Sequence, residues 1–471
     1  MKNTIFSILL ILLTFSLVLS QDENASGTSA GLGTVVIDGE TYNQIAFRPE
    51  FPVGKKLKIA LDLYFYFNDD GLYEGSWDFS SGNAANTLLD KIYYIKWGKP
   101  SDDLYFIIGA LSSVTIGQGI LVNNYSNTIQ YPSIRRVGLD YNMKVSNIDV
   151  QVVLSDFKQS EPGLIGTRLG YNLNDKMSFG VGYATDLDQV AGLIDSDNDN
   201  YPDAFDDFPY DNEYYDQANY DEETTGYWSD VYQEIMDEDA SGFDDWFENS
   251  DIRNKYNQDN YNKDKISGIS LDAIYSLSNS LSFYAQAAQL QGDNVILESG
   301  EETKLGFGFT FPGMVAKLGK LATFRAEYRQ NSDHFMFNFW DQTYDLNRAT
   351  VIRVLNDNDE PQDSIITKRD LLRDKMAMKG YFLQLSAGIP NLVEFDAGYQ
   401  HLFPSDDTLD PTKSFLATLN INARKIPKLE KAVLFYQHNN TADPFTESEN
   451  LIHGYDLGVK VANGVMLVYQ G

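Results

Sequence analysis

The chain has 471 residues, of which 43% are hydrophobic and 13% aromatic, so it is too rich in large side chains to be mainly disordered. A formal charge of −32 and a pI near 4.3 exclude a nucleic-acid partner, which requires a basic surface, and favour cations instead. The sequence has no cysteine, which excludes disulfides, thiolate metal sites and cysteine nucleophiles.

Residues 1–20, MKNTIFSILLILLTFSLVLS, have the pattern of a secretory signal peptide: Lys2 near the start, then an apolar run, then small residues. We therefore expect cleavage after Ser20 and an exported mature chain, residues 21–471. An uncleaved anchor is the alternative, but the apolar run is short for a membrane span of about 20 residues. No later stretch of that length lacks polar residues, so we expect no membrane-spanning helix.

Past residue 30 the apolar residues recur at every second position, which indicates strands. Residues 57–67 alternate in this way, and residues 393–400 and 414–422 repeat the pattern, with Leu416 as an exception. The alternating segments are about ten residues long, whereas ordinary strands average about five or six and tilted membrane strands need about 9–11. The strands are therefore long enough to cross a membrane.

The predicted connections alternate in length along the chain. Tight ones lie at residues 173–175, 277–280, 389–392 and 462–464, and long polar ones at residues 69–90, 187–265, 333–376 and 404–413. Short turns on one side and long loops on the other are typical of an outer-membrane barrel.

This pattern resembles bacterial outer-membrane β-barrel proteins of the porin-like class over most of residues 30–471. The resemblance implies an all-β fold: an antiparallel transmembrane β-barrel of about 18–20 strands, with short periplasmic turns and long extracellular loops, in contact with outer-membrane lipid. An exported β-sandwich, propeller or solenoid would also alternate. However, the sequence has no blade-length repeat, and a sandwich does not need ten-residue strands.

Residues 187–265 form the longest predicted loop, with 24 acidic residues against four basic ones. The loop contains two patterns of oxygen ligands at the spacing that calcium requires, because alternate side chains converge on one ion where the chain turns sharply. The first resembles thrombospondin type 3 repeats, although Asn200 stands where glycine is usual. The second, DEDASGFDDWFE, resembles an EF-hand loop, with Gly242 at the turn. The expected calcium ligands are Asp195, Asp197, Asp199, Tyr201, Asp203 and Asp206 in the first pattern, and Asp237, Asp239, Ser241, Phe243, Asp245 and Glu248 in the second. A solvated acidic loop that binds ions diffusely is the alternative.

Two other features are open to more than one interpretation. Arg135 and Arg136 follow the glycine-containing segment TIGQGILVNNYSN, which could fold inward and narrow a lumen, or they could be ordinary strand-end charges. Asp333 and His334 are the one pair suggestive of acid–base chemistry, but no convincing serine or carboxylate partner lies beside them. A loop histidine is the simpler interpretation, and we expect no enzyme. Omptin-like proteases and barrel phospholipases are the hydrolase families to exclude.

The sequence thus predicts a passive, cation-favouring pore for small polar or cationic solutes, with a calcium-ordered external loop. The alternative is a non-conducting barrel for adhesion or envelope assembly. A turn count gives about 19 strands, with an initial strand at residues 31–37 and a last one that runs outward. Since closed bacterial barrels have even strand numbers and end periplasmically, we expect one further strand beyond residue 471, or a miscount around residues 112–132.

Overall fold

The computed structural model describes most of the chain. The described residues are 29–37, 40–69, 71–73, 75–80, 84–131, 134–195, 202–206, 263–296, 300–319, 321–355, 361–389, 392–406, 408–421, 429–448, 451–462 and 465–470. The predicted signal peptide, residues 1–20, and most of the acidic loop lie outside these residues.

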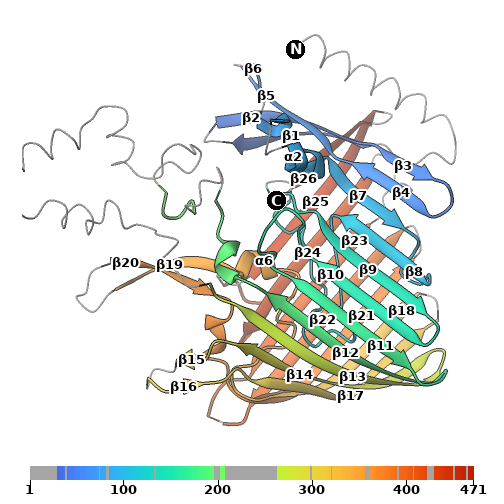
Figure 1. Cartoon of the computed structure of the whole chain (residues 1–471), viewed down its shortest axis with the longest axis vertical. Helices are drawn as coiled ribbons and strands as arrows, with labels where there is room; N and C mark the ends of the chain where they lie inside the picture. The colour runs from blue at the N-terminus through green and yellow to red at the C-terminus, as the bar shows by residue number, and fades with distance from the viewer. Residues whose placement is uncertain are drawn as a thin grey trace, which may run out of the picture.

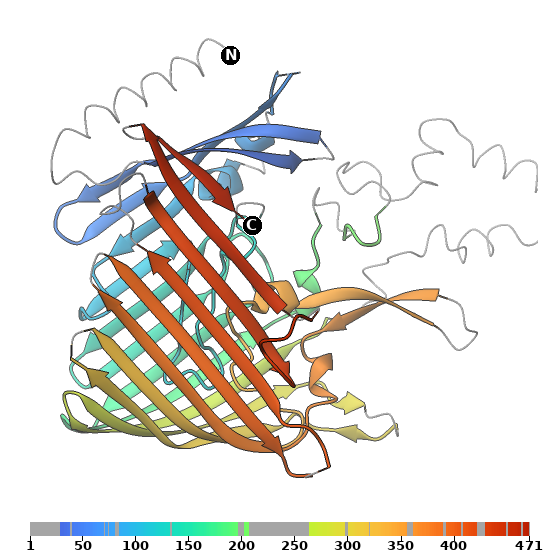
Figure 2. The ribbon, with the colours of Figure 1, turned by 180° about the vertical axis from the view of Figure 1, so that it is seen from behind.

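The chain forms a closed antiparallel barrel of 18 strands (Figures 1 and 2). In chain order the barrel strands are β3 (Glu50–Val53), β4 (Leu57–Leu61), β7 (Ile92–Trp97), β8 (Leu104–Gly109), β9 (Gly138–Val145), β10 (Ile148–Leu154), β11 (Ile165–Asn172), β12 (Met177–Asp186), β13 (Ile266–Ser278), β14 (Leu281–Gly292), β17 (Phe307–Leu318), β18 (Ala322–Asn331), β21 (Met378–Ile389), β22 (Val393–Pro404), β23 (Thr412–Ile421), β24 (Leu429–Thr441), β25 (Leu451–Ala462) and β26 (Val465–Gln470). The predicted transmembrane barrel is confirmed.

The two faces of the barrel wall differ in the way that the alternation predicts. On β12, Phe179, Val181 and Tyr183 are exposed on the outside, whereas Gly180 and Gly182 are buried on the inside. Because the barrel is closed, no unpaired strand edge is left in lipid, and its apolar exterior matches the hydrocarbon of a bilayer. The two features together place the chain in a bacterial outer membrane. Among the described residues, no helix is long and apolar enough to span a membrane.

All short hairpins lie at one end of the barrel, the short-turn face, and all long connections at the other, the long-loop face (Figure 1). The four predicted tight turns join β11 to β12, β13 to β14, β21 to β22 and β25 to β26. The predicted long connections also fall between barrel strands, although two of them contain the short strands β6, β19 and β20, and β23 begins at Thr412, before the predicted end of the connection 404–413.

A small second sheet, the upper sheet, has the order β1-β2-β5-β6 and lies at the top of Figure 1. Its strands are β1 (Ser29–Ile37), β2 (Glu40–Arg48), β5 (Leu63–Asn68) and β6 (Gly71–Leu72), followed by the 3-10 helix η1 (Gly75–Trp77) and helix α2 (Ala84–Asp90). The alternating stretch 57–67 is therefore two strands, β4 and β5, separated at Asp62. The Asp62 side chain is buried and forms ion pairs with Arg48 (2.8 Å) and Arg135 (3.3 Å).

The barrel has 18 strands, within the predicted range of about 18–20, and the turn count of about 19 exceeded this number by one. Residues 31–37 belong to β1, which pairs with β2 in a separate sheet and lies beside β26, and residues 112–127 contain only isolated bridges. β26 does run toward the long-loop face, as predicted, but it lies next to β3 and closes the barrel with an even number of strands.

The long connections contain further short elements at the long-loop face. They are η2 (Gln189–Gly192), β15 (Val295–Ile296), β16 (Glu302–Thr303), α6 (Tyr344–Asn347), β19 (Ala349–Leu355), β20 (Pro361–Thr367) and η4 (Asp370–Leu372). The β19–β20 hairpin projects away from the barrel (Figure 1).

Candidate functional site: the barrel lumen

Two long connections fold into the lumen, the first inner segment (residues 110–137) and the second inner segment (residues 332–348). They are joined by an isolated parallel bridge between Val122 and Trp340. The Trp340 N–H donates to the Leu121 carbonyl (3.0 Å), and the Asn123 N–H donates to the Trp340 carbonyl (3.1 Å). The TIGQGILVNNYSN segment thus folds inward, which is one of the two interpretations that the sequence left open.

An apolar cluster holds both inner segments against the inside of the wall from β10 to β14. It includes Val122 and Tyr125 from the first segment and Phe339 and Trp340 from the second, all nearly or fully buried. Val153, Ala184 and Leu290 contribute the inward face of the wall. One side of the lumen is therefore filled like the core of a soluble protein, because packing together removes the apolar surface of these side chains from water and stabilises the fold.

Gly117 turns the first inner segment over a buried ion pair. Its φ of +59° favours glycine, and a Cβ there would lie 3.1 Å from the Arg168 side chain. Arg168 donates from Nε (2.7 Å) and Nη2 (2.6 Å) to the two carboxylate oxygens of Asp272. The pair joins β11 to β13 across β12, and its Arg168 side chain packs against the turn at Gly117.

A second charged group anchors the neighbouring residue, Gln118. Arg325 on β18 donates to the Gln118 carbonyl and forms an ion pair with Glu327. Glu327 also pairs with Arg329 (2.6 Å), and all three side chains are largely buried. The first inner segment is thus fixed to the wall on both sides of its turn.

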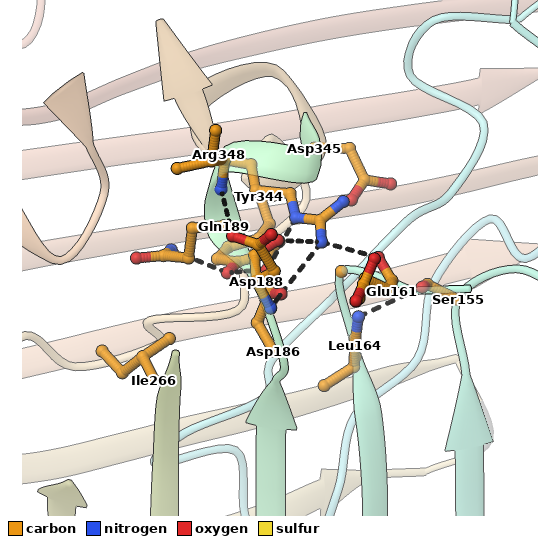
Figure 3. A network of polar contacts seen from close by, with 12 residues as sticks. Ser155, Glu161, Leu164, Asp186, Asp188, Gln189, Ile266, Tyr344, Asp345 and Arg348 are labelled. Atoms are coloured by element: carbon orange, nitrogen blue, oxygen red, sulfur yellow. Dashed lines mark hydrogen bonds and ion pairs between the residues drawn. The ribbon is translucent and has the colours of Figure 1, made fainter. Parts of the chain in front are cut away.

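A polar network at the mouth joins the second inner segment to the start of the acidic loop (Figure 3). Arg348 donates to both carboxylate oxygens of Asp186, at 2.6 and 2.9 Å, and to the backbone carbonyls of Glu161 and Asp188. The Tyr344 hydroxyl donates to Asp186 (2.8 Å). Burial, reinforced by the Asp186 carboxylate, raises the pKa of Tyr344 well above its usual range, so Tyr344 remains a donor.

The same network reaches the first inner segment through Asp345. Its carboxylate accepts from the buried Tyr125 hydroxyl (2.9 Å) and faces Arg136 at 3.7 Å. The mouth network therefore fixes the two inner segments relative to each other as well as to the wall.

On the opposite side, toward β18 and β21–β25, the lumen is hollow. A cavity of about 1390 Å³, the turn-side cavity, extends to the short turns at Lys317 and Ile389. A second cavity of about 410 Å³, the loop-side cavity, extends to Leu371 and Lys375 at the long-loop face. Both volumes are large enough for a small solute.

Four residues line both cavities, and all four carry carboxamides: Asn123, Asn124, Gln342 and Gln384. We call them the carboxamide junction. Asn123, Asn124 and Gln342 come from the inner segments, and Gln384 comes from β21 in the wall. Asn124 Nδ2 donates to Gln342 Oε1 (3.2 Å), and Gln384 Nε2 donates to Asp396 (3.0 Å).

Charged groups around the cavities occur in both signs. Arg48, Lys317, Glu394 and Asp396 line the turn-side cavity, and Arg329, Asp341, Lys368, Asp374 and Lys375 line the loop-side cavity. Lys368 pairs with Asp341 at 3.1 Å. The described lining has no surplus of acidic groups.

Nine of the twelve predicted calcium ligands, including all six of the second pattern, lie outside the described residues. Asp195, Asp203 and Asp206 are described, and the Asp203 N–H donates to the Ile194 carbonyl (2.8 Å). Within the described part of the chain, no group of three or more acidic or histidine side chains is placed to hold a metal. The calcium loops remain a prediction.

The structure places the other candidates away from the open lumen. Arg135 pairs with Asp62 and lies 3.6 Å from the centre of the Tyr64 ring, and neither Arg135 nor Arg136 lines the two large cavities. His334 lies in a loop, as expected, with Nδ1 3.0 Å from the Leu372 carbonyl.

Sequence reasoning missed the carboxamide junction. The position of Gln384 in the lumen could have been predicted, because this residue lies on the polar face of an alternating strand. Asn123 and Asn124 lie in the segment suspected of folding inward, but nothing in their pattern indicates that they meet Gln342, 218 positions beyond Asn124.

No protein-family model matches this chain, and no curated protein does. Solved structures that match the chain include in-vitro folded OmpT, an outer membrane protein of Vibrio cholerae, with 6% identity, a TM-score of 0.28, and 91% of this chain and 95% of that chain covered. OccK11 (OpdR) of Pseudomonas aeruginosa has 8% identity and a TM-score of 0.34, covering 91% and 92%. An anion-selective porin from Comamonas acidovorans has 11% identity and a TM-score of 0.28, covering 86% and 89%. Likeness at this level does not extend to function.

Proposed function

We propose that the protein is a passive outer-membrane channel for small polar solutes. One observation carries this proposal: the turn-side and loop-side cavities adjoin at the carboxamide junction, so hollow space follows one side of the lumen from the short turns to the mouth. The inner segments that bound this space are fixed by buried ion pairs and an apolar cluster, which favours a permanent passage over a collapsible one.

Planar-bilayer recording of the purified protein in KCl tests the proposal. We expect discrete current steps, smaller in Gln384→Trp, because the added ring enters the junction. Gln291→Trp is the matched control, since Gln291 is exposed on β14 and lines neither cavity. Absence of steps in the folded wild-type protein would favour the non-conducting surface barrel instead.

The proposed preference for cations has a different source. The described lining is balanced in charge, so the preference would come from the 24 acidic residues of the 187–265 loop, which concentrate cations at low salt. Deleting residues 190–262 should then shift the reversal potential in a salt gradient toward zero. An unchanged reversal potential would contradict this origin.

We also propose that the acidic loop binds calcium through its two ligand patterns. Binding is expected to be weak, with a Kd of about 10⁻⁴–10⁻³ M, as in extracellular modules. Calorimetry should show one site fewer when Asp237 and Glu248 are replaced by alanine. Unchanged stoichiometry would contradict the assignment.

A further inference from the structure

We infer that the carboxamide junction is a binding site for neutral, hydroxyl-rich solutes such as small sugars and polyols. This inference rests on the proposed channel and deepens it, because it names the class of solute that binds where the two cavities share their lining. It begins from the composition of the junction: all four residues shared by the two cavities are amides, and none is ionised.

The junction residues retain unused polar atoms. Asn123 Oδ1 accepts from Thr115 (3.3 Å), but its Nδ2 makes no hydrogen bond within the described residues. Gln342 uses Oε1 and Gln384 uses Nε2, which leaves one polar atom on each amide for a solute. Turning an amide over exchanges donor and acceptor but still leaves one of them unused.

Asn338, another residue that lines the loop-side cavity, carries a further acceptor. Asn338 Oδ1 is shielded from solvent, and it has no hydrogen-bond partner among the described residues. Polar atoms of this kind are expensive to leave unpaired, so they mark places where a water or a solute hydroxyl binds.

Hydroxyl and amide side chains continue on both sides of the junction. Ser112, Ser113, Thr115, Ser386 and Thr418 line the turn-side cavity. Gln400, Ser414, Gln437, Asn439 and Asn440 line the loop-side cavity. A solute that exchanges water for these groups meets both donors and acceptors in the two cavities.

The chemistry of the junction discriminates against ions. A neutral polyol exchanges hydrogen bonds with water for hydrogen bonds with amides, and loses little. An ion that enters the same place gives up charge-stabilising hydration, and the four amides offer no opposite charge in return. The Asp396 carboxylate beside Gln384 already accepts hydrogen bonds from Gln384 and Ser386. Neutral solutes with several hydroxyls are therefore retained better than charged solutes of the same size.

The test uses the full-length protein in planar bilayers, with glucose, gluconate and glucosamine as probes of similar size. Glucose should reduce the KCl current in a saturable manner, and the two charged probes should do so less. Gln342→Leu and Gln384→Leu should each weaken the apparent glucose affinity by about 2- to 12-fold, as expected for the loss of one neutral hydrogen bond. Gln291→Leu should match the wild type.

Calorimetric titration of the detergent-solubilised protein with glucose separates the two proposals. If no current is observed, the channel proposal fails, while glucose binding that weakens in the two leucine variants still supports the site. Glucose binding that is absent, equal to that of gluconate or glucosamine, or unchanged in Gln342→Leu and Gln384→Leu would overturn the inference.

Discussion

Arg348 and Asp186 form a two-contact ion pair with side chains only 2% and 0% exposed, where the second inner segment meets the end of β12. Removing one partner of such a pair leaves a buried charge without compensation, which typically costs about 3–5 kcal/mol. We expect Arg348→Ala to lower the unfolding midpoint strongly. Arg348→Met combined with Asp186→Asn should be less destabilising than Arg348→Ala, because no net charge remains buried. Equal losses would show that packing, and not charge, governs this site.

Gly308 on β17 lies directly beneath Phe335 of the second inner segment. A Cβ at Gly308 would lie 2.3 Å from the Phe335 ring, whereas one at Gly398 would lie 3.3 Å from the Phe382 ring. We expect Gly308→Ala to lower the free energy of unfolding by about 1–3 kcal/mol, and Gly398→Ala to be nearly neutral. Adding Phe335→Ala to Gly308→Ala should restore part of the loss. A fully additive double variant would contradict the direct contact.

We expect titration of Lys91 to make the stability of the upper sheet depend on pH. Burial lowers the pKa of Lys91 to about 8, and its ammonium lies 4.4 Å from the centre of the Trp77 ring. Between about pH 8 and the model-peptide value of about 10.4, the unfolded chain binds the proton that the folded one has released, so stability rises with pH over this window. Tryptophan fluorescence should show a transition centred near pH 8 that is lost in Lys91→Met. The same transition in that variant would assign it to another group.

The closed barrel should be visible in simple biochemistry. We expect the protein to fractionate with outer membranes and to migrate faster on unheated than on heated denaturing gels, because the barrel stays folded until it is boiled. Recovery as a soluble periplasmic species would contradict the membrane location argued from the apolar exterior.

Much of the wall could be predicted from alternation alone. Asp396 and Gln400 lie on the polar face of residues 393–400, and both line the lumen. Leu416 broke the pattern of its strand, and it too faces the loop-side cavity. Period-two patterning is a local property of strands, which explains its success.

The lumen interior could not be predicted in the same way. Asp62 interrupts an alternating stretch because Arg48 and Arg135 meet it there, and these partners are 14 and 73 positions away. The junction likewise depends on the Val122–Trp340 bridge between two connections without periodic pattern. Contacts of this kind are set by tertiary packing, which a single sequence does not display.

The filled half of the lumen also constrains the order of assembly. Most of the apolar cluster joins residues near position 120 to residues near position 340 and to the inward face of β10–β14, which precede β21 in the chain, and Leu402 on β22 joins it from beyond β21. Once β26 meets β3, the wall is closed and its interior can be reached only from the two ends. We therefore expect the inner segments to settle onto a still open, curved sheet that includes β22, before β26 closes the wall.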